Sequence, residues 1–235
     1  MRLPAPLFPG RLVRRYKRFL ADIRLDSGET VVAHCANPGS MAGVAVEGAP
    51  VWASKSDNPA RKLAWSWELV DIDGVLVGIN TANPNRIAAE AIRAGAVPAL
   101  AGYRTLRREV KYGAASRIDL LLEDGQDGRP CYVEIKNVHL SRAPGLAEFP
   151  DAVTARGAKH LEELAAVARE GARAVMLFVV QRGDCAAFRP AADIDPDYAE
   201  GLRRAVAAGV ETLCYDCAVS LDAVTLRRPL PMRLS

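Results

Sequence analysis

The sequence predicts an α/β protein with an all-β N-terminal domain, in which a small barrel over residues 1–83 is followed by an α/β domain over residues 84–235. In the first part, short apolar runs alternate with turn signals at the spacing of a barrel. The second part follows the order helix, three strands, helix, strand, which favours a mixed sheet with a crossover helix. The segment 80–85 (Asn-Thr-Ala-Asn-Pro-Asn) separates the two parts and has the composition of a loop.

Composition limits the classes of protein to consider. The chain has 235 residues, 50% of them hydrophobic and 25% charged, which is typical of a folded globular protein. A net charge of +3 gives only a weak overall field, so any affinity for nucleic acid must come from local clusters. The N-terminus lacks a signal-peptide core, and no apolar run approaches the roughly 18 residues of a membrane helix. We therefore expect a cytoplasmic protein with reduced cysteines and no membrane partner.

The barrel is predicted from about five short strands. These strands are expected at 11–25, 30–35, 50–55, 63–72 and 75–80. Gly, Asn, Pro and Asp punctuate the gaps between them. An OB-like barrel is one fold of this kind, and OB-like barrels often bind nucleic acid.

Basic residues crowd the first predicted strand. Arg14, Arg15, Lys17 and Arg18 occur with no acid among them and with Tyr16 and Phe19 interleaved, a pattern typical of a surface that follows phosphates and stacks on bases. Arg61 and Lys62 add a second basic point. The alternative is a solvated strand face, since basic runs are common on surfaces. The alternation around Trp65 and Trp67 favours packing in the core over base stacking.

The helix expected over 86–94 carries one acidic residue where apolar residues are expected. Asn85 is placed to cap this helix. Its inward stripe contains Ile87, Glu90, Ala91 and Ala94. Glu90 is therefore a candidate additional metal ligand. The alternative is a glutamate at the edge of the stripe that reaches solvent or a neighbouring arginine.

Two short apolar runs, 118–122 and 132–138, carry the chemistry. Asp119, Glu134 and Lys136 lie inside these runs, and a buried carboxylate is normally paired or bound to a metal. Glu134 and Lys136 are two apart in a strand, so they project to the same face. We predict that Asp119 and Glu134 hold Mg²⁺ or Mn²⁺ and that Lys136 positions or deprotonates a water, giving three catalytic residues. The alternative is a purely structural Glu–Lys contact.

A helix over 154–171 follows a loop at 139–153 and leads to a buried, parallel strand at 174–181. Arg156, Lys159 and His160 share one face of its first turns, close to the strand end that carries Glu134. We expect this face to bind a phosphate of the nucleic acid. The alternative is a basic first turn that is simply solvated. A strand at 104–112 precedes this core, and a helix at 197–208 and strands at 211–219 and 223–227 complete the domain.

This order of elements, with an aspartate on the second strand and Glu-x-Lys on the third, resembles the core of the PD-(D/E)xK nuclease superfamily. The whole chain also resembles the sugar fermentation stimulation protein family. The resemblance is carried by 15–22, 34–35, 37–41, 57–58, 61–63, 67–69, 109–113, 116–119, 134–136, 149–154, 156–157 and 159–161. Ala36 and Asn137 depart from the pattern, where proline and serine are expected.

The resemblance implies an OB-like domain, a nuclease-like domain, sequence-tolerant DNA binding and a regulatory part in sugar (maltose) utilisation. We therefore expect a DNA-binding protein that cleaves a phosphodiester with Mg²⁺ or Mn²⁺. One alternative is a DNA-binding regulator that does not cleave, and another is a nuclease that processes single strands or RNA. The DNA form, duplex or single-stranded, is left open, as is a homodimer.

Overall fold

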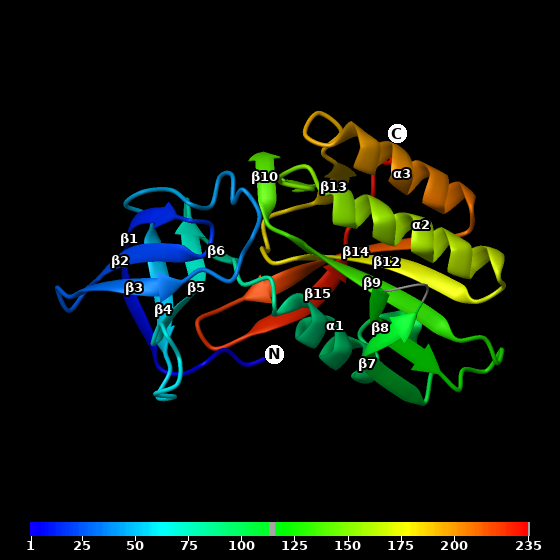
Figure 1. Ribbon diagram of the computed structural model, residues 1–235, viewed down its shortest axis with the longest axis horizontal. Coiled ribbons are helices and arrows are strands. Elements are labelled where there is room, and N and C mark those ends of the chain that lie inside the picture. The colour runs from blue at the N-terminus through cyan, green and yellow to red at the C-terminus, as the bar shows by residue number, and fades with distance from the viewer. Residues whose placement is uncertain (113–115, 235) are drawn as a thin grey trace.

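A computed structural model describes residues 1–112 and 116–234 (Figure 1). A β-barrel, blue to cyan in the figure, lies beside an α/β domain that contains the rest of the chain. The barrel strands are β1 (Leu7–Tyr16), β2 (Leu20–Leu25), β3 (Thr30–His34), β4 (Pro50–Lys55), β5 (Trp65–Ile72) and β6 (Val75–Gly78). They hydrogen-bond in the order β3-β2-β1-β4-β5-β6, and an additional pairing of β3 with β5 closes the barrel. The predicted barrel architecture is confirmed.

The long strand predicted over 11–25 is instead a hairpin of β1 and β2. Its turn contains Lys17 (φ 48°) and Arg18 (φ 62°), both in the left-handed region. Turns of this kind usually carry asparagine or glycine, so two long basic residues gave no turn signal.

Trp67 is fully buried in the barrel core, and its Nε1 donates to the carbonyl of Leu69 at 2.9 Å. The ring of Trp65 packs edge-on against Phe8 at 5.0 Å. Core packing of both tryptophans is thereby confirmed. A register shift between β4 and β5 interrupts the expected alternation, so that Leu69 faces the second domain while Trp67 and Val70 face the barrel core.

The second domain is built on a six-stranded sheet in the order β15-β14-β12-β9-β8-β7. The elements are α1 (Pro84–Arg93), a 3₁₀ turn (Pro98–Leu100), β7 (Thr105–Tyr112), β8 (Ser116–Glu123), β9 (Cys131–Val138), α2 (Ala155–Arg169), β12 (Arg173–Val180), α3 (Pro196–Ala207), β14 (Glu211–Val219) and β15 (Val224–Pro229). α2 connects β9 to the parallel β12, as predicted for a crossover. α2 and α3 cover one face of the sheet and α1 covers the other (Figure 1). Gly113, part of the 109–113 stretch, lies outside the described residues.

The segment predicted as the loop 139–153 forms part of a small separate sheet. β10 (Leu140–Ala143) and β11 (Leu146–Phe149) pair antiparallel, and β11 pairs in parallel with β13 (Ala187–Pro190). Each of these strands has only four residues, too few to show a periodicity. The buried Glu148 stabilises the sheet by ion pairs to Arg142 at 2.7 Å and Arg189 at 2.9 Å.

Loops at one end of the barrel are hydrogen-bonded to the second domain. The backbone amide of Met41 donates to Asp151 Oδ2 at 2.9 Å, and the Ser40 hydroxyl donates to the Asp151 carbonyl. The amide of Gly78 donates to the carbonyl of Gln181 at 2.8 Å. The two domains are therefore joined by specific polar contacts as well as by the chain.

All five cysteines are free and buried, as expected. Within the part of the chain that the structure describes, no helix is long and apolar enough to span a membrane.

Candidate functional site

The site forms where β8 and β9 stop pairing. The ladder between them runs from Leu122 opposite Cys131 to Leu120 opposite Val133 and goes no further. One residue beyond it, Asp119 Oδ2 accepts a hydrogen bond from the amide of Ile135 at 2.7 Å. The Asp119 carboxylate thus replaces the backbone carbonyl that would accept this hydrogen bond in a continuous β-ladder. This hydrogen bond brings Asp119 to the segment of β9 that carries Glu134 and Lys136. The structure brings the three predicted residues together.

Asp119 is a carboxylate that is hard to ionise. Burial and the negative charge of Glu134 raise its pKa to about 6, although hydrogen bonds from Ile135 and Asn85 act in the opposite direction. Glu134 is therefore close enough to disfavour the charged form of Asp119.

Glu134 is only 2% exposed, and its two oxygens differ. Oε1 accepts from Lys136 Nζ at 2.8 Å and also contacts His160 Nδ1. Oε2 is buried and has no hydrogen-bond partner among the described residues. Burial acts to raise the pKa of Glu134, but the hydrogen bonds from His160 and Lys136 and the positive charge of Lys136 outweigh burial and hold this pKa below its ordinary value. One oxygen of a buried anion is thus satisfied and the other is free.

His160 belongs to this cluster of side chains and not to a phosphate-binding face. Its Nε2 accepts from Arg156 Nε at 3.2 Å, so the ring proton lies on Nδ1 and points at Glu134. Lys136 Nζ lies 3.2 Å from the same Nδ1. His160 is buried because it lies on the face of α2 that also carries Leu161 and Leu164.

The predicted cationic face of α2 is therefore formed only in part, because Arg156 is exposed but His160 is buried. Lys159 turns to Glu163 on the next turn, with 3.5 Å between Nζ and Oε1, and His160 turns inward. Helical spacing placed the three residues on one side of α2 but did not reveal that His160 belongs to the buried face of the helix. A phosphate contact of Arg156 and Lys159 stays a prediction.

Asn85 and Glu109 are members of the site that the sequence did not identify. Asn85 Nδ2 donates to Asp119 Oδ1 at 2.8 Å and to Glu109 Oε1 at 3.2 Å. Glu109 lies in β7 between the pairs Arg108–Leu120 and Val110–Ile118, and so opposite Asp119. Its φ of 54° is in the left-handed region, unusual for a residue inside a strand and often found at functional sites. Asn85 was expected to cap this helix, but α1 begins at Pro84 with Asn83 as its N-cap residue, so Asn85 lies inside the first turn and its side chain is free to reach Asp119.

Glu90, predicted as a further metal ligand, is not part of this pocket. Its side chain is 52% exposed, and its carboxylate pairs with the Met1 amino group at 2.8 Å. Ile87 and Ala91 occupy the buried stripe of α1, and Glu90 lies at its edge. The alternative interpretation, in which Glu90 lies at the edge of the stripe, is therefore the one that the structure shows.

The basic residues of the barrel fall into two groups. Arg15 is bound to its own domain, because its guanidinium donates to the carbonyls of Arg18, Asn37, Gly39 and Ser40. Arg14 pairs with Asp22 at 2.7 Å, and Arg61 donates to the Ser66 hydroxyl at 2.8 Å. Lys17, Arg18 and Lys62 are exposed and form no ion pair within residues 1–112 and 116–234.

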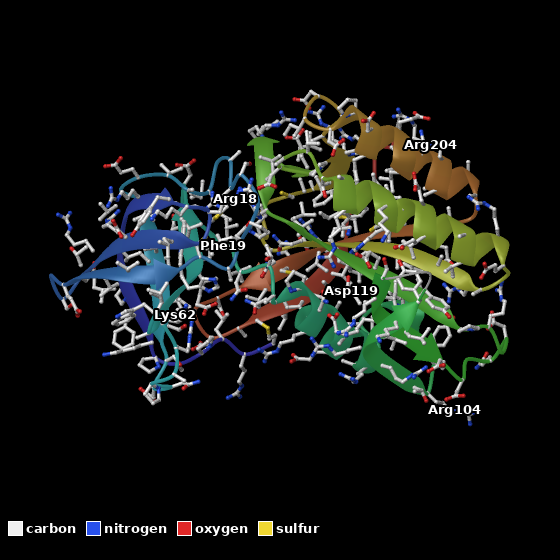
Figure 2. All side chains as sticks on the ribbon, viewed as in Figure 1. Arg18, Phe19, Lys62, Arg104, Asp119 and Arg204 are labelled. Carbon is white, nitrogen blue, oxygen red and sulfur yellow. The ribbon has the colours of Figure 1, made fainter. Side chains whose placement is uncertain are left out.

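Phe19 lies directly beside the two cations of the β1–β2 turn. It is 46% exposed, and its ring stacks on His34 with centroids 6.5 Å apart. In Figure 2, Arg18 and Phe19 appear on the side of the barrel nearest to the second domain, and Lys62 appears farther from that domain. An exposed aromatic ring beside free cations suits nucleic acid, as predicted for this stretch.

No set of three His, Cys, Asp or Glu side chains converges as a complete metal cage within the described ranges. The side-chain cluster at Asp119 offers two carboxylates, which is the usual protein share of a Mg²⁺ site.

Comparison with known proteins gives a consistent result. The model of the SfsA N-terminal OB domain matches residues 13–79, and that of the sugar fermentation stimulation protein RE domain matches residues 82–223. The chain is 63% identical to a sugar fermentation stimulation protein homolog of Rhodospirillum centenum, over 98% of both chains. It is 58% identical to the homolog of Maricaulis maris, over the full length of both.

A solved structure of Pyrococcus furiosus SfsA in complex with Ca²⁺ superposes with a TM-score of 0.89 at 28% identity, and the match covers 99% of this chain and 98% of that one. The order of the two domains is therefore the same in both proteins.

Proposed function

This chain belongs to the sugar fermentation stimulation protein family, and from that premise we propose that it binds DNA and cleaves a phosphodiester with a divalent cation held by Asp119 and Glu134. The observation that carries the proposal is the free, buried Oε2 of Glu134 beside a second carboxylate. A buried oxygen with no donor is costly, and a cation is the partner that also relieves the repulsion between two acids.

The donor set fits a hard cation. Both groups are carboxylates, which are preferred by Mg²⁺ and Mn²⁺, and waters or phosphate oxygens complete such sites. The Pyrococcus furiosus protein was solved in complex with Ca²⁺, which has the same preference for oxygen, and this supports the proposal. When bound, the ion would supply Lewis acidity for a phosphate oxygen and a nearby water.

The side chains of the pocket have complementary roles. Lys136 carries a positive charge at the carboxylate pair, where it can orient a water and stabilise charge on the phosphate. His160 fixes the rotamers of Glu134 and Lys136 by contacting both, and Arg156 fixes the tautomer of His160. Asn85 orients Asp119 from α1. Side chains from α1, β9 and α2 therefore hold the carboxylates of Asp119 and Glu134 in place.

Lys17, Arg18, Lys62 and Phe19 are the proposed contacts of the barrel with DNA. Their charges meet the backbone, which carries no sequence information, so the proposed binding is sequence-tolerant. A regulatory part in sugar (maltose) utilisation enters the proposal from the family resemblance alone.

A nicking assay on supercoiled plasmid with Mg²⁺ or Mn²⁺ tests the proposal. We expect the wild-type chain to nick, and Glu134→Gln and Asp119→Asn to lose about 10²-fold or more of the rate. Glu162→Gln, an exposed acid on α2, is the matched control and should keep the rate. Equal nicking by the wild-type chain and Glu134→Gln would remove the proposed site.

A second candidate function is a DNA-binding regulator that does not cleave. It is favoured by one observation, namely that Glu134 already has a cationic partner in Lys136 and a further contact with His160. It predicts salt-sensitive duplex binding without nicking under either metal. The nuclease for single strands or RNA stays a proposal that the same assay tests with those substrates.

A further inference from the structure

A pocket of about 290 Å³ lies between the barrel and the second domain. Pro38 and Gly39 of the barrel line one side, and Phe149, Pro150, Ala152 and Val153 of the second domain line the other. Its volume is near the lower end of the range for pockets that bind small ligands, about 300 Å³. The remaining lining residues are polar, namely Asn37, Thr81, Asn137, His139, Asp151 and Thr154, so the pocket suits a ligand with an apolar body and a polar edge.

His139 supplies a buried polar donor at this pocket. Gln181 Nε2 donates to the carbonyl of Asn80 at 3.1 Å and to Asn137 Oδ1 at 2.6 Å, which fixes the orientation of the Asn137 amide. Asn137 Nδ2 is therefore the atom that donates to His139 Nδ1, at 3.0 Å. The ring proton of His139 must then lie on Nε2.

That Nε2 has no hydrogen-bond partner in the described part of the chain, although His139 is only 4% exposed. The carboxylate of Asp151 is near it, with 3.3 Å between Nε2 and Oδ2, but the geometry is not that of a hydrogen bond, and Oδ2 accepts from Met41 instead. A buried N–H without a hydrogen bond thus lies in the wall of the pocket, next to the carboxylate of Asp151. A ligand with an acceptor and a donor side by side would satisfy both groups.

The pocket also adjoins the proposed cleavage site along the chain. Asn137 directly follows Lys136 in β9, and Thr154 caps α2, which carries His160. On the barrel side, the loop of Asn37 and Gly39 is held by Arg15, which also binds the carbonyl of Arg18 in the exposed turn. Residues that line the pocket are therefore connected to the cationic turn through Arg15 and to the acidic site through β9 and α2.

We propose that this pocket receives one unpaired nucleobase of the nucleic acid, next to the phosphodiester at Asp119 and Glu134. A base has a flat apolar body and a polar edge on which acceptors and donors alternate, as the walls, His139 and Asp151 require. This inference rests on the proposed function and adds a substrate class to it, namely DNA with an unpaired nucleotide.

The test measures equilibrium binding of the full chain without metal, so that cleavage plays no part. The probes are a duplex with a single bulged 2-aminopurine, the same duplex fully paired, and free 2-aminopurine deoxynucleoside monophosphate. We expect the bulged duplex to bind about tenfold more tightly than the paired one, with a change in 2-aminopurine fluorescence on binding.

Ala152→Phe, which fills the pocket, should reduce this preference to below about twofold while affinity for the paired duplex stays unchanged. Val206→Phe on the exposed side of α3 is the matched control and should keep the preference. Equal affinity of the wild-type chain for both duplexes, or a preference that survives Ala152→Phe, would overturn the inference. So would binding of the free nucleotide as tight as that of the bulged duplex, because the site would then serve a small molecule.

Failure of the inference and failure of the proposed function have different signatures. Metal-dependent nicking of plasmid that Glu134→Gln abolishes, without any preference for the bulge, would refute only the base pocket. Nicking unaffected by Glu134→Gln would refute the proposed function itself.

Discussion

Asp119 is the residue on which the electrostatics of the pocket depend. Its pKa of about 6 in the folded chain is above the ordinary 3.8, because the carboxylate is buried near Glu134. Between these two values the folded state binds more protons than the unfolded state. The free energy of unfolding should therefore fall as pH rises through this window and stay lower above it.

We predict that Asp119→Asn raises the free energy of unfolding by about 1–3 kcal/mol near pH 8 and flattens its dependence on pH between about 4 and 6. Urea denaturation of both proteins across that range measures the effect, with Asp57→Asn, an exposed acid, as the control. Added Mn²⁺ should stabilise the wild-type chain and not the variant. A variant less stable than wild type near pH 8 would show that ionised Asp119 stabilises the fold.

At the residue scale, the sequence predicts which charged side chains come together better than it predicts their hydrogen-bond partners. Charged residues inside apolar strands were enough to identify Asp119, Glu134 and Lys136. The contacts of Asn85 and Glu109 depend on how α1 and β7 pack on β8, which no local pattern encodes. Glu90 was predicted as a metal ligand because helical spacing puts it near the buried stripe of α1. The pattern within the helix could not reveal that its carboxylate pairs with the Met1 amino group, which is distant in sequence.

Among the elements, the turn between β1 and β2 has the clearest conflict between conformation and sequence. Lys17 and Arg18 occupy left-handed positions that asparagine and glycine adopt at lower cost. A contact of Lys17 and Arg18 with phosphates would explain why two cations occupy these costly backbone positions.

The double variant Lys17→Asn, Arg18→Gly should therefore be more stable than wild type, by about 0.5–1.5 kcal/mol, and weaker in binding DNA. The slope of log K against log salt should shrink by about 1.4–1.8, the share of two phosphate contacts. Titration of duplex and single strands at several salt concentrations measures it. Removing two cations from α3 by Arg203→Gln and Arg204→Gln should leave the slope unchanged, and an unchanged slope in the turn variant would exclude the contact.

Elements with a long, clear period were predicted closely. α2 and the all-apolar β12 lie where the sequence places them, because a buried face imposes its spacing over many residues. The short β10, β11 and β13 were missed, since four residues show no period and their pairing is between distant segments.

At the scale of the whole molecule, the contact at Gly39 fixes the barrel against the second domain. A Cβ on Gly39 would lie 2.5 Å from Asp151 Oδ2 and 2.6 Å from Oδ1. The Asp151 carboxylate is held by the Met41 amide, so it has little freedom to move away.

We predict that Gly39→Ala lowers the free energy of unfolding by about 1–3 kcal/mol and separates one thermal transition into two. Scanning calorimetry measures this directly. Gly201→Ala on α3, where the added Cβ meets Leu161 Cδ1 at an ordinary 3.4 Å, is the control and should keep one transition. A single unshifted transition in Gly39→Ala would mean that the two domains are not coupled through this loop.

The proposed function depends above all on Asp119 and Glu134 binding one divalent cation together. A crystal soaked in Mn²⁺ and recorded for anomalous scattering tests this most directly. We expect one strong peak between the two carboxylates in the wild-type chain and none in Glu134→Gln. Saturating Mn²⁺ with no peak at this position, or a peak that persists in Glu134→Gln, would contradict it.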